Sequence, residues 1–468
     1  MKDYDQLSAR ALAKAIRKQK ISSLEATKEA IERLKAAHEI THCLLSLEAD
    51  AALKAAKAVD AEIDKGKHKL PLDGVPLAHK DMFDRKGKIA TWGARIRAEQ
   101  PAKQDATVIG RLKEAGALQI ATLHLTEFAF GPTGHNYVLG HARNPWDPSR
   151  ITGGSSAGTA AAVAYGAIPA GLGSDTGGSL RLPAACCGVT SIKPTWGRVS
   201  RAGAMPLAPA LDTIGVVARH VEDLALMMRV MAGHDARDAG SSSVKVPDYV
   251  DHLDDGLKGV KLGIDAAVNG QASGPVQKML DTVTGILTGL GLRKVDATFP
   301  DWQTMDHLTQ LVQQPDAAAA HDHYLRTRAD DYGPQVRARL EIGHFIPAVA
   351  HLTALRARGT YLQRTIDSAF KTADVVLLPV LADPLPTIAE LDVGGGPNTA
   401  ATLGRVIKFT RVINYLGLPA LTLPVPRGSG LPNGFQLVGK PYSEALLLAI
   451  GQAYQQEVPP EVARLVKA

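Results

Sequence analysis

Apolar and polar positions along this chain follow helical and strand spacing in turn. Helical spacing predicts helices over residues 8–18, from Ser22 onward and over 50–65, and Ser22 with Glu25 has the form of a capping box. Short apolar runs predict strands at 118–123 and 434–439. The same reasoning predicts helices at 105–116, 221–232, 275–290 and 443–455, and strands at 260–264, 295–299, 374–379 and 417–424. This alternation is typical of an α/β fold.

Two glycine-serine clusters interrupt the pattern between residues 151 and 188. The first, residues 153–158, leads into a small-residue helix whose free amides favour negative charge. The second, residues 173–179, allows a sharp turn in which successive amides converge on one oxygen beside Ser179. A single cluster of this kind is most often a loop. Two of them in one short stretch favour a site for acyl transfer.

A base for such a nucleophile is suggested upstream, at Lys80. It follows the apolar run at 75–78, which predicts a buried strand. Burial disfavours the ammonium form of a lysine and so lowers its pKa. Each pKa unit by which it falls requires about 1.4 kcal/mol from the environment in the fold. A lone lysine is usually a solvated surface charge, so this role depends on the fold.

These residues resemble the amidase signature enzymes, serine hydrolases of carbon-nitrogen bonds with a Ser-Ser-Lys triad in which one serine follows a cis peptide bond. The motifs Gly-Val-Pro-…-Lys-Asp, Gly-Gly-Ser-Ser-Ala-Gly and Gly-Ser-Asp-Thr-Gly-Gly-Ser-Leu-Arg-Leu-Pro occur in the family's order and spacing, and the resemblance spans most of the chain. It implies one large α/β domain over residues 1–468, with a central mixed β-sheet covered on both faces by α-helices. Ala157 departs from the usual glycine, and His79 precedes the lysine, where we expect a packed histidine.

The resemblance also implies roles for individual residues. Ser179 matches the nucleophile, Ser155 the bridging serine and Lys80 the base that later returns a proton to the leaving nitrogen. The backbone of four consecutive residues matches the oxyanion hole, and Ala129 matches a position whose backbone contacts the acyl group. The four are Thr176, Gly177, Gly178 and Ser179.

Three parts of the expected domain differ in character. Residues 1–65 form N-terminal helices, residues 70–220 form the signature core with the triad, and residues 301–364 form a variable helical region that we expect to cover the cleft. Phe130 together with residues 301–364 is a candidate lining of the acyl pocket. That lining suggests apolar or aromatic substrates.

Composition excludes several classes of protein. The formal charge of +6 comes from 53 basic and 47 acidic residues, and no long block of one sign occurs. Such a mildly basic composition is not typical of a nucleic-acid-binding protein. Three cysteines, two of them adjacent, give no disulfide framework and favour the cytoplasm. The N-terminus lacks the apolar core of a signal peptide, and no apolar run has membrane-spanning length. We expect a small-molecule amide as partner, no direct nucleic acid, no membrane, and neither cofactor nor metal; a homodimer stays open.

Other motifs compete with this interpretation. His38, Glu39 and His42 fit the HExxH pattern of zinc peptidases, but the segment resembles a helix end turning into extended chain. Residues 154–158 also fit G-x-S-x-G with Ser156 as nucleophile, but loop rather than strand precedes them. Ser242 and Lys245 fit a β-lactamase motif without its companions. A non-catalytic scaffold is disfavoured because all three triad positions are present.

We therefore expect a serine amidase that hydrolyses a carboxamide, or an aryl amide or carbamate, and releases acid with amine or ammonia. The alternative is the glutaminase-type A subunit of a glutamine-dependent tRNA amidotransferase, for which the resemblance implies the same fold and triad. Co-purification with partner subunits would favour the alternative.

Overall fold

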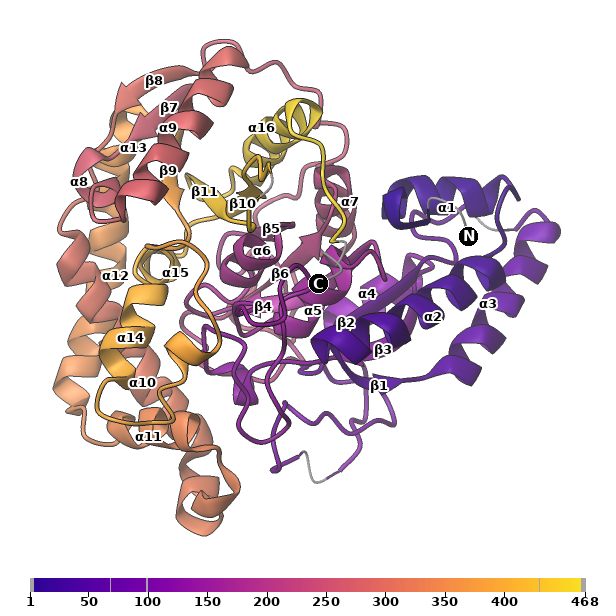
Figure 1. Ribbon diagram of the computed structural model, residues 1–468, viewed down its shortest axis with the longest axis horizontal. Helices are drawn as coiled ribbons and strands as arrows, with labels where there is room; N and C mark the ends of the chain where they lie inside the picture. Colours follow the sequence, from indigo (N-terminus) through magenta and orange to yellow (C-terminus); the bar gives the residue numbers. More distant parts are fainter. Residues whose placement is uncertain (1–3, 68, 98–99, 429, 464–468) are drawn as a thin grey trace.

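The computed structural model describes residues 4–67, 69–97, 100–428 and 430–463, and within them the strands form two sheets (Figure 1). The larger has eight strands in the order β4-β6-β5-β10-β11-β9-β7-β8, and the smaller has three in the order β1-β3-β2. The strands are β1 (Leu44–Leu47), β2 (Pro76–Lys80), β3 (Leu118–Leu123), β4 (Ala170–Asp175), β5 (Thr190–Lys193), β6 (Thr213–Ala218), β7 (Lys261–Ile264), β8 (Arg293–Asp296), β9 (Val375–Pro379), β10 (Ala420–Pro424) and β11 (Gly434–Gly439).

Sixteen α-helices of the described residues surround these sheets (Figure 1). They are α1 (Ala9–Arg17), α2 (Ser23–Thr41), α3 (Ala49–Asp64), α4 (Thr107–Glu114), α5 (Ala157–Ala164), α6 (Arg181–Cys187), α7 (Val221–Met231), α8 (Ala266–Asn269), α9 (Gly274–Gly289), α10 (Trp302–Thr327), α11 (Pro334–Gly343), α12 (Ala348–Asp367), α13 (Ala369–Thr372), α14 (Thr399–Val406), α15 (Arg411–Leu416) and α16 (Glu444–Glu457). Figure 1 shows α10, α11 and α12 on the side of the molecule opposite α1, α2 and α3. Among the described helices, none is both long and apolar enough to cross a membrane.

The eight-stranded sheet is mixed and, apart from its edge strand β8, is covered on both faces. β7 runs parallel to β8 and β9, whereas β4, β5, β6, β10 and β11 pair antiparallel with their neighbours. Successive strand residues point to opposite faces. Accordingly Val375 and Leu377 join one hydrophobic cluster, with α7, α9 and α16, while Val376 and Leu378 join another, with α10, α12 and α15. This confirms the expected α/β fold with a helix-covered mixed sheet.

Local sequence signals set many of the element boundaries. The Ser22 hydroxyl accepts a hydrogen bond from the Glu25 amide at 3.0 Å, and the Glu25 carboxylate accepts one from the Ser22 amide at 2.8 Å, which confirms the capping box. β3 and β11 have the predicted bounds. The strand predicted at 295–299 is instead β8, which begins and ends earlier in the chain. β8 is a largely exposed edge strand, so its apolar pattern is weak.

The strand that ends at Lys80 belongs to the smaller sheet, a separation that the sequence did not predict. β2 pairs with β3 and also lies against β4 of the larger sheet. This contact needs a glycine on β4, because a Cβ at Gly171 would lie 2.5 Å from the Ala78 carbonyl oxygen. The two sheets therefore approach closely where Lys80 meets the end of β4.

Candidate active site

The side-chain amine of Lys80 is buried at the centre of the site. Only 1% of the residue is exposed, and its Nζ donates hydrogen bonds to Ser155 Oγ at 2.7 Å and to Ser174 Oγ at 2.9 Å. Burial lowers the pKa of Lys80 to about 7, although the nearby carboxylates of Asp175 and Asp212 act in the opposite direction. Near neutral pH a large share of Lys80 is therefore an uncharged amine, which can accept a proton.

The two glycine-serine clusters meet beside this lysine. The Gly154–Ser155 peptide bond is cis, and Ser155 is fully buried just before α5. The Ser156 amide donates to the Ser179 carbonyl at 3.3 Å, which connects the second cluster to the first. Within the described residues, no hydrogen bond joins the hydroxyls of Ser155 and Ser179. The fold thus brings Lys80 to Ser155 and sets the Ser179 turn against the same segment.

The turn that carries Ser179 is held by two residues from other parts of the chain, Asp212 and Thr410. Asp212 accepts a hydrogen bond from the Thr176 hydroxyl at 2.6 Å, and the Thr410 hydroxyl donates to the Gly177 carbonyl at 2.6 Å. Gly178 has φ of 134°, a conformation that favours glycine, and a Cβ there would lie 2.5 Å from the Thr410 hydroxyl. The backbone of this turn is therefore fixed before any substrate binds.

The amides of the turn are not equally free. The Gly178 amide donates to Asp175 Oδ1 at 2.8 Å, so it is already used. The amides of Thr176, Gly177 and Ser179 donate to no acceptor in the part of the chain that the structure describes. The set of donors available to an oxyanion is therefore narrower than the four residues expected from the sequence.

A buried ion pair next to this turn supports it. Arg181 donates to both carboxylate oxygens of Asp175, at 3.0 and 2.9 Å, and neither side chain is exposed. Asn414 and Gln436 accept the remaining Arg181 hydrogen bonds, at 2.6 and 2.9 Å. Although burial opposes its charge, the arginine holds the pKa of Asp175 well below its ordinary value. The sequence contained Asp175 and Arg181 within its motif, but nothing local indicated Asn414 or Thr410.

Two cavities border the turn on different sides. The first, which we call the Ser179 cavity, measures about 290 Å³ including its mouth, and its lining includes Ala129, Phe130, Ser179, Gln313 and Arg339. The last two come from α10 and α11, within the region expected to cover the cleft.

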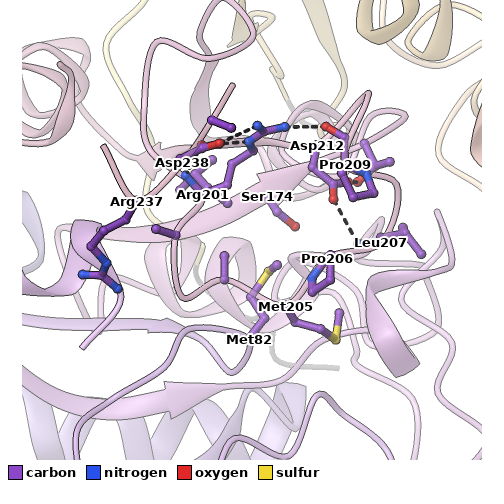
Figure 2. Close-up of a pocket in the computed structure, with 15 residues that line it drawn as sticks. Met82, Ser174, Arg201, Met205, Pro206, Leu207, Pro209, Asp212, Arg237 and Asp238 are labelled. Atoms are coloured by element: carbon purple, nitrogen blue, oxygen red, sulfur yellow. Dashed lines mark hydrogen bonds and ion pairs between the residues drawn. The ribbon is translucent and has the colours of Figure 1, made fainter. Parts of the chain in front are cut away.

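The second, the Arg201 cavity, is larger, at about 660 Å³ (Figure 2). Ser174 and Asp212 line it, but Arg201 is already paired with Asp238 at 2.7 Å. Thr176 and Leu207 line both cavities, so the oxyanion turn stands between them. Because the reactive serine candidate lines only the first, we take the Ser179 cavity as the substrate site.

The competing nucleophile Ser156 has no suitable geometry. It is fully buried, and its hydroxyl donates to the Ser174 carbonyl at 3.4 Å. Loop, not strand, precedes it, so the strand–turn–helix elbow of an α/β-hydrolase is not formed.

The histidines singled out in the sequence are also accounted for. α2 ends at Thr41, His42 has left-handed backbone, and His38 Nδ1 accepts from the Leu44 amide at 3.2 Å. The described residues contain no cluster of three or more His, Cys, Asp or Glu that could hold a metal. His79 Nδ1 accepts from the Leu172 amide at 3.1 Å, and burial with Arg85 lowers its pKa to about 3. His79 is thus a neutral, packed histidine, as expected.

Comparison with known proteins agrees with this geometry. A family model for amidases matches residues 25–448. The A subunit of the glutamyl-tRNA(Gln) amidotransferase of Chloroflexus aurantiacus is 36% identical over 480 residues, covering 97% of each chain, and that of Moorella thermoacetica is 37% identical, covering 96% of each. The chain belongs to the amidase signature family. As a member it is a hydrolase that acts on carbon-nitrogen bonds, which confirms the family and reaction class implied by the motifs.

Solved structures of this family share the fold over almost the whole chain. One, from a protein complex that bears on the origins of an s-triazine catabolic enzyme, has a TM-score of 0.90 at 30% identity and covers 98% of this chain and 100% of its own. A crystal structure of an amidase has a TM-score of 0.84 at 30% identity, covering 96% of this chain and 100% of its own.

Proposed function

We propose that this amidase signature enzyme hydrolyses a small carboxamide through an acyl-enzyme on Ser179. The observation that carries the proposal is the buried Lys80 amine, 2.7 Å from the Ser155 hydroxyl and with a pKa lowered to about 7. A serine hydroxyl is a weak nucleophile until a base removes its proton. Neutral Lys80 supplies that base through Ser155, which passes the proton on from Ser179.

Each step of the reaction then uses groups of this chain. Lys80 takes a proton from Ser155, Ser155 takes one from Ser179, and Ser179 Oγ attacks the amide carbonyl carbon. The free amides of Gly177 and Ser179 hold the oxyanion of the tetrahedral intermediate. The relay returns the proton to the nitrogen, the carbon-nitrogen bond breaks, and ammonia or amine leaves.

Water completes the cycle through the same relay. It attacks the ester carbon of the acyl-enzyme while its proton passes through Ser155 to Lys80. The ester bond breaks, the proton returns to Ser179 Oγ, and the acid leaves. Ser174 positions Lys80 throughout, because its hydroxyl accepts the second hydrogen bond of Nζ at 2.9 Å.

The test measures ammonia from aliphatic primary amides and 4-nitroaniline from 4-nitroanilides, with wild type, Ser179→Ala, Ser155→Ala, Lys80→Ala and Ser156→Ala. We expect turnover to fall by orders of magnitude in the three triad variants, on the order of 10³-fold or more. Ser156→Ala is the matched control, because Ser156 neighbours Ser155 and its hydroxyl donates its hydrogen bond to the Ser174 carbonyl, not to a member of the triad. An inactive Ser156→Ala beside an active Ser179→Ala would reverse the assignment.

The second candidate is the A subunit of a glutamine-dependent tRNA amidotransferase. The curated relatives favour it over a free-standing amidase, because they carry that function at 36% and 37% identity along nearly the whole chain. In this case ammonia from glutamine would pass to partner chains. Glutaminase activity that appears only when partner subunits co-purify would support it, whereas full activity of the single chain on other amides would oppose it.

A further inference from the structure

Arg339 is a cation in the Ser179 cavity without an acidic partner. It is the one charged residue among the described residues that line this cavity. Its guanidinium donates to the Phe130 carbonyl at 2.9 Å and lies 3.7 Å from the centre of the Phe130 ring. No ion pair to Arg339 occurs in residues 4–67, 69–97, 100–428 and 430–463. A partly buried cation of this kind is costly unless an anion completes it.

The surrounding charges leave this cation uncompensated. The nearby Arg411 has its own carboxylate, since both its Nε and one terminal nitrogen donate to Asp306. Removal from water and the charge of Arg411 lower the pKa of Arg339 to about 9, so it stays protonated at neutral pH. A negatively charged ligand group beside Arg339 would therefore restore the local balance of charge.

Unpaired amide groups lie near the same cavity. Both polar atoms of the Gln335 side chain are buried without a hydrogen-bond partner among the described residues. Gln335 lies one helical turn before Arg339 on α11, and its Oε1 is 3.3 Å from where a Cβ on Gly131 would be, beside the cavity wall. Gln313 reaches the wall from α10 and faces Gly177 of the oxyanion turn. These groups suit a polar ligand better than an apolar one.

We propose that the Ser179 cavity selects small amides that carry a carboxylate, bound by Arg339, and no ammonium group. The inference rests on the proposed hydrolysis at Ser179 and names its substrate class. Arg339 and Ser179 line one cavity, so the carboxylate and the scissile amide lie at opposite ends of one short molecule. An apolar or aromatic acyl group, which Phe130 suggested in the sequence, would have to displace the arginine from that ring.

This class excludes glutamine as the preferred substrate. The α-ammonium of glutamine needs a carboxylate or several acceptors, and the described lining of the cavity includes no Asp or Glu. An amide of the same length without the amino group keeps the interaction with Arg339 and avoids burying the ammonium. The cavity thus separates the two functions proposed above.

The test compares three primary amides of equal chain length: glutaramate, which has one negative charge, L-glutamine, which is a zwitterion, and valeramide, which is uncharged. We expect kcat/KM for glutaramate to exceed both others by about tenfold or more. Arg339→Gln should raise KM for glutaramate by about tenfold to a hundredfold and change valeramide hydrolysis less than about threefold. Arg339→Lys should recover part of the loss, and Arg337→Gln is the matched control, because Arg337 lies on the same helix but pairs with Asp330 and Glu341 outside the cavity.

A binding measurement keeps this inference separate from the proposed reaction. Calorimetric titration of Ser179→Ala with glutaramate and with valeramide needs no turnover, and we expect glutaramate to bind more tightly by about tenfold. Equal binding of both amides, a preference for glutamine, or an equal effect of Arg339→Gln on all three would overturn the role of Arg339. Tight binding of glutaramate without Ser179-dependent turnover of any amide would instead contradict the proposed reaction and leave the anion site standing.

Discussion

Replacing Lys80 by methionine should abolish turnover and at the same time stabilise the fold. Burial lowers the pKa of Lys80 from 10.5 to about 7. At about 1.4 kcal/mol for each pKa unit, about 5 kcal/mol opposes the protonated form in the folded protein. Between these two pKa values the unfolded chain binds the proton and the folded chain does not, so stability rises with pH through this window. The cost of Lys80 is therefore full below about pH 7 and vanishes above about pH 10.5.

The net effect of Lys80→Met on folding stability can be worked out at two pH values. At about pH 7.5 the cost of Lys80 is about 4 kcal/mol, and at about pH 9.5 it is about 1 to 2 kcal/mol. Methionine has similar length and no charge, but it leaves the Ser155 and Ser174 hydroxyls without their hydrogen bonds to Nζ, at about 1 kcal/mol each. Lys80→Met should thus gain about 2 kcal/mol at the lower pH and nothing at the higher.

Urea unfolding followed by tryptophan fluorescence, together with amide turnover, checks both halves of this prediction. Ser179→Ala is the control, since it should be equally inactive while its unfolding midpoint stays within experimental error of wild type at both pH values. The reasoning is refuted if Lys80→Met is less stable than wild type near neutral pH, or if its gain does not shrink as the pH rises.

Three further outcomes follow from the same geometry. Because neutral Lys80 is the base, kcat/KM should rise about tenfold per pH unit below about pH 7 and level off above it; a profile that is flat across this range would contradict the role of Lys80. Gly171→Ala should push β2 away from β4, lower the free energy of unfolding by about 1–3 kcal/mol and reduce turnover, as checked by circular dichroism melts and activity assays. Gly256→Ala is the control: a Cβ there meets no atom within 4 Å, so stability and turnover should stay unchanged. Asp175→Asn leaves Arg181 as an unpaired buried charge and should lower the free energy of unfolding by about 3–5 kcal/mol in chemical denaturation, and an unchanged midpoint would count against the ion pair.

The sequence predicted those parts of the fold that local patterns encode. Helix caps such as Ser22 with Glu25 and apolar runs such as β3 and β11 gave correct elements because each depends on neighbouring residues. That β2 pairs with β3 in a smaller sheet and only packs against β4 escaped prediction, since both the pairing and the close approach of Gly171 to Ala78 join residues far apart in the chain.

The same distinction holds for the site. Lys80, Ser155 and Ser179 stood out by their motifs, and the structure brings Lys80 to Ser155 as expected. Other groups of the site come from distant segments and have no local sequence signal. Thr410 donates a hydrogen bond to the Gly177 carbonyl, and the guanidinium of Arg339 lies over the ring of Phe130. Their roles follow only from three-dimensional packing.

The central claim, that Ser179 is the nucleophile, is tested most directly by locating a covalent adduct. The protein would be incubated with a fluorophosphonate that phosphonylates activated serines, digested, and sequenced by mass spectrometry. We expect one adduct, on Ser179, formed more slowly in Lys80→Ala and absent from Ser179→Ala. An adduct on Ser156 or Ser155 in the wild type, or labelling that persists in Ser179→Ala, would contradict the assignment.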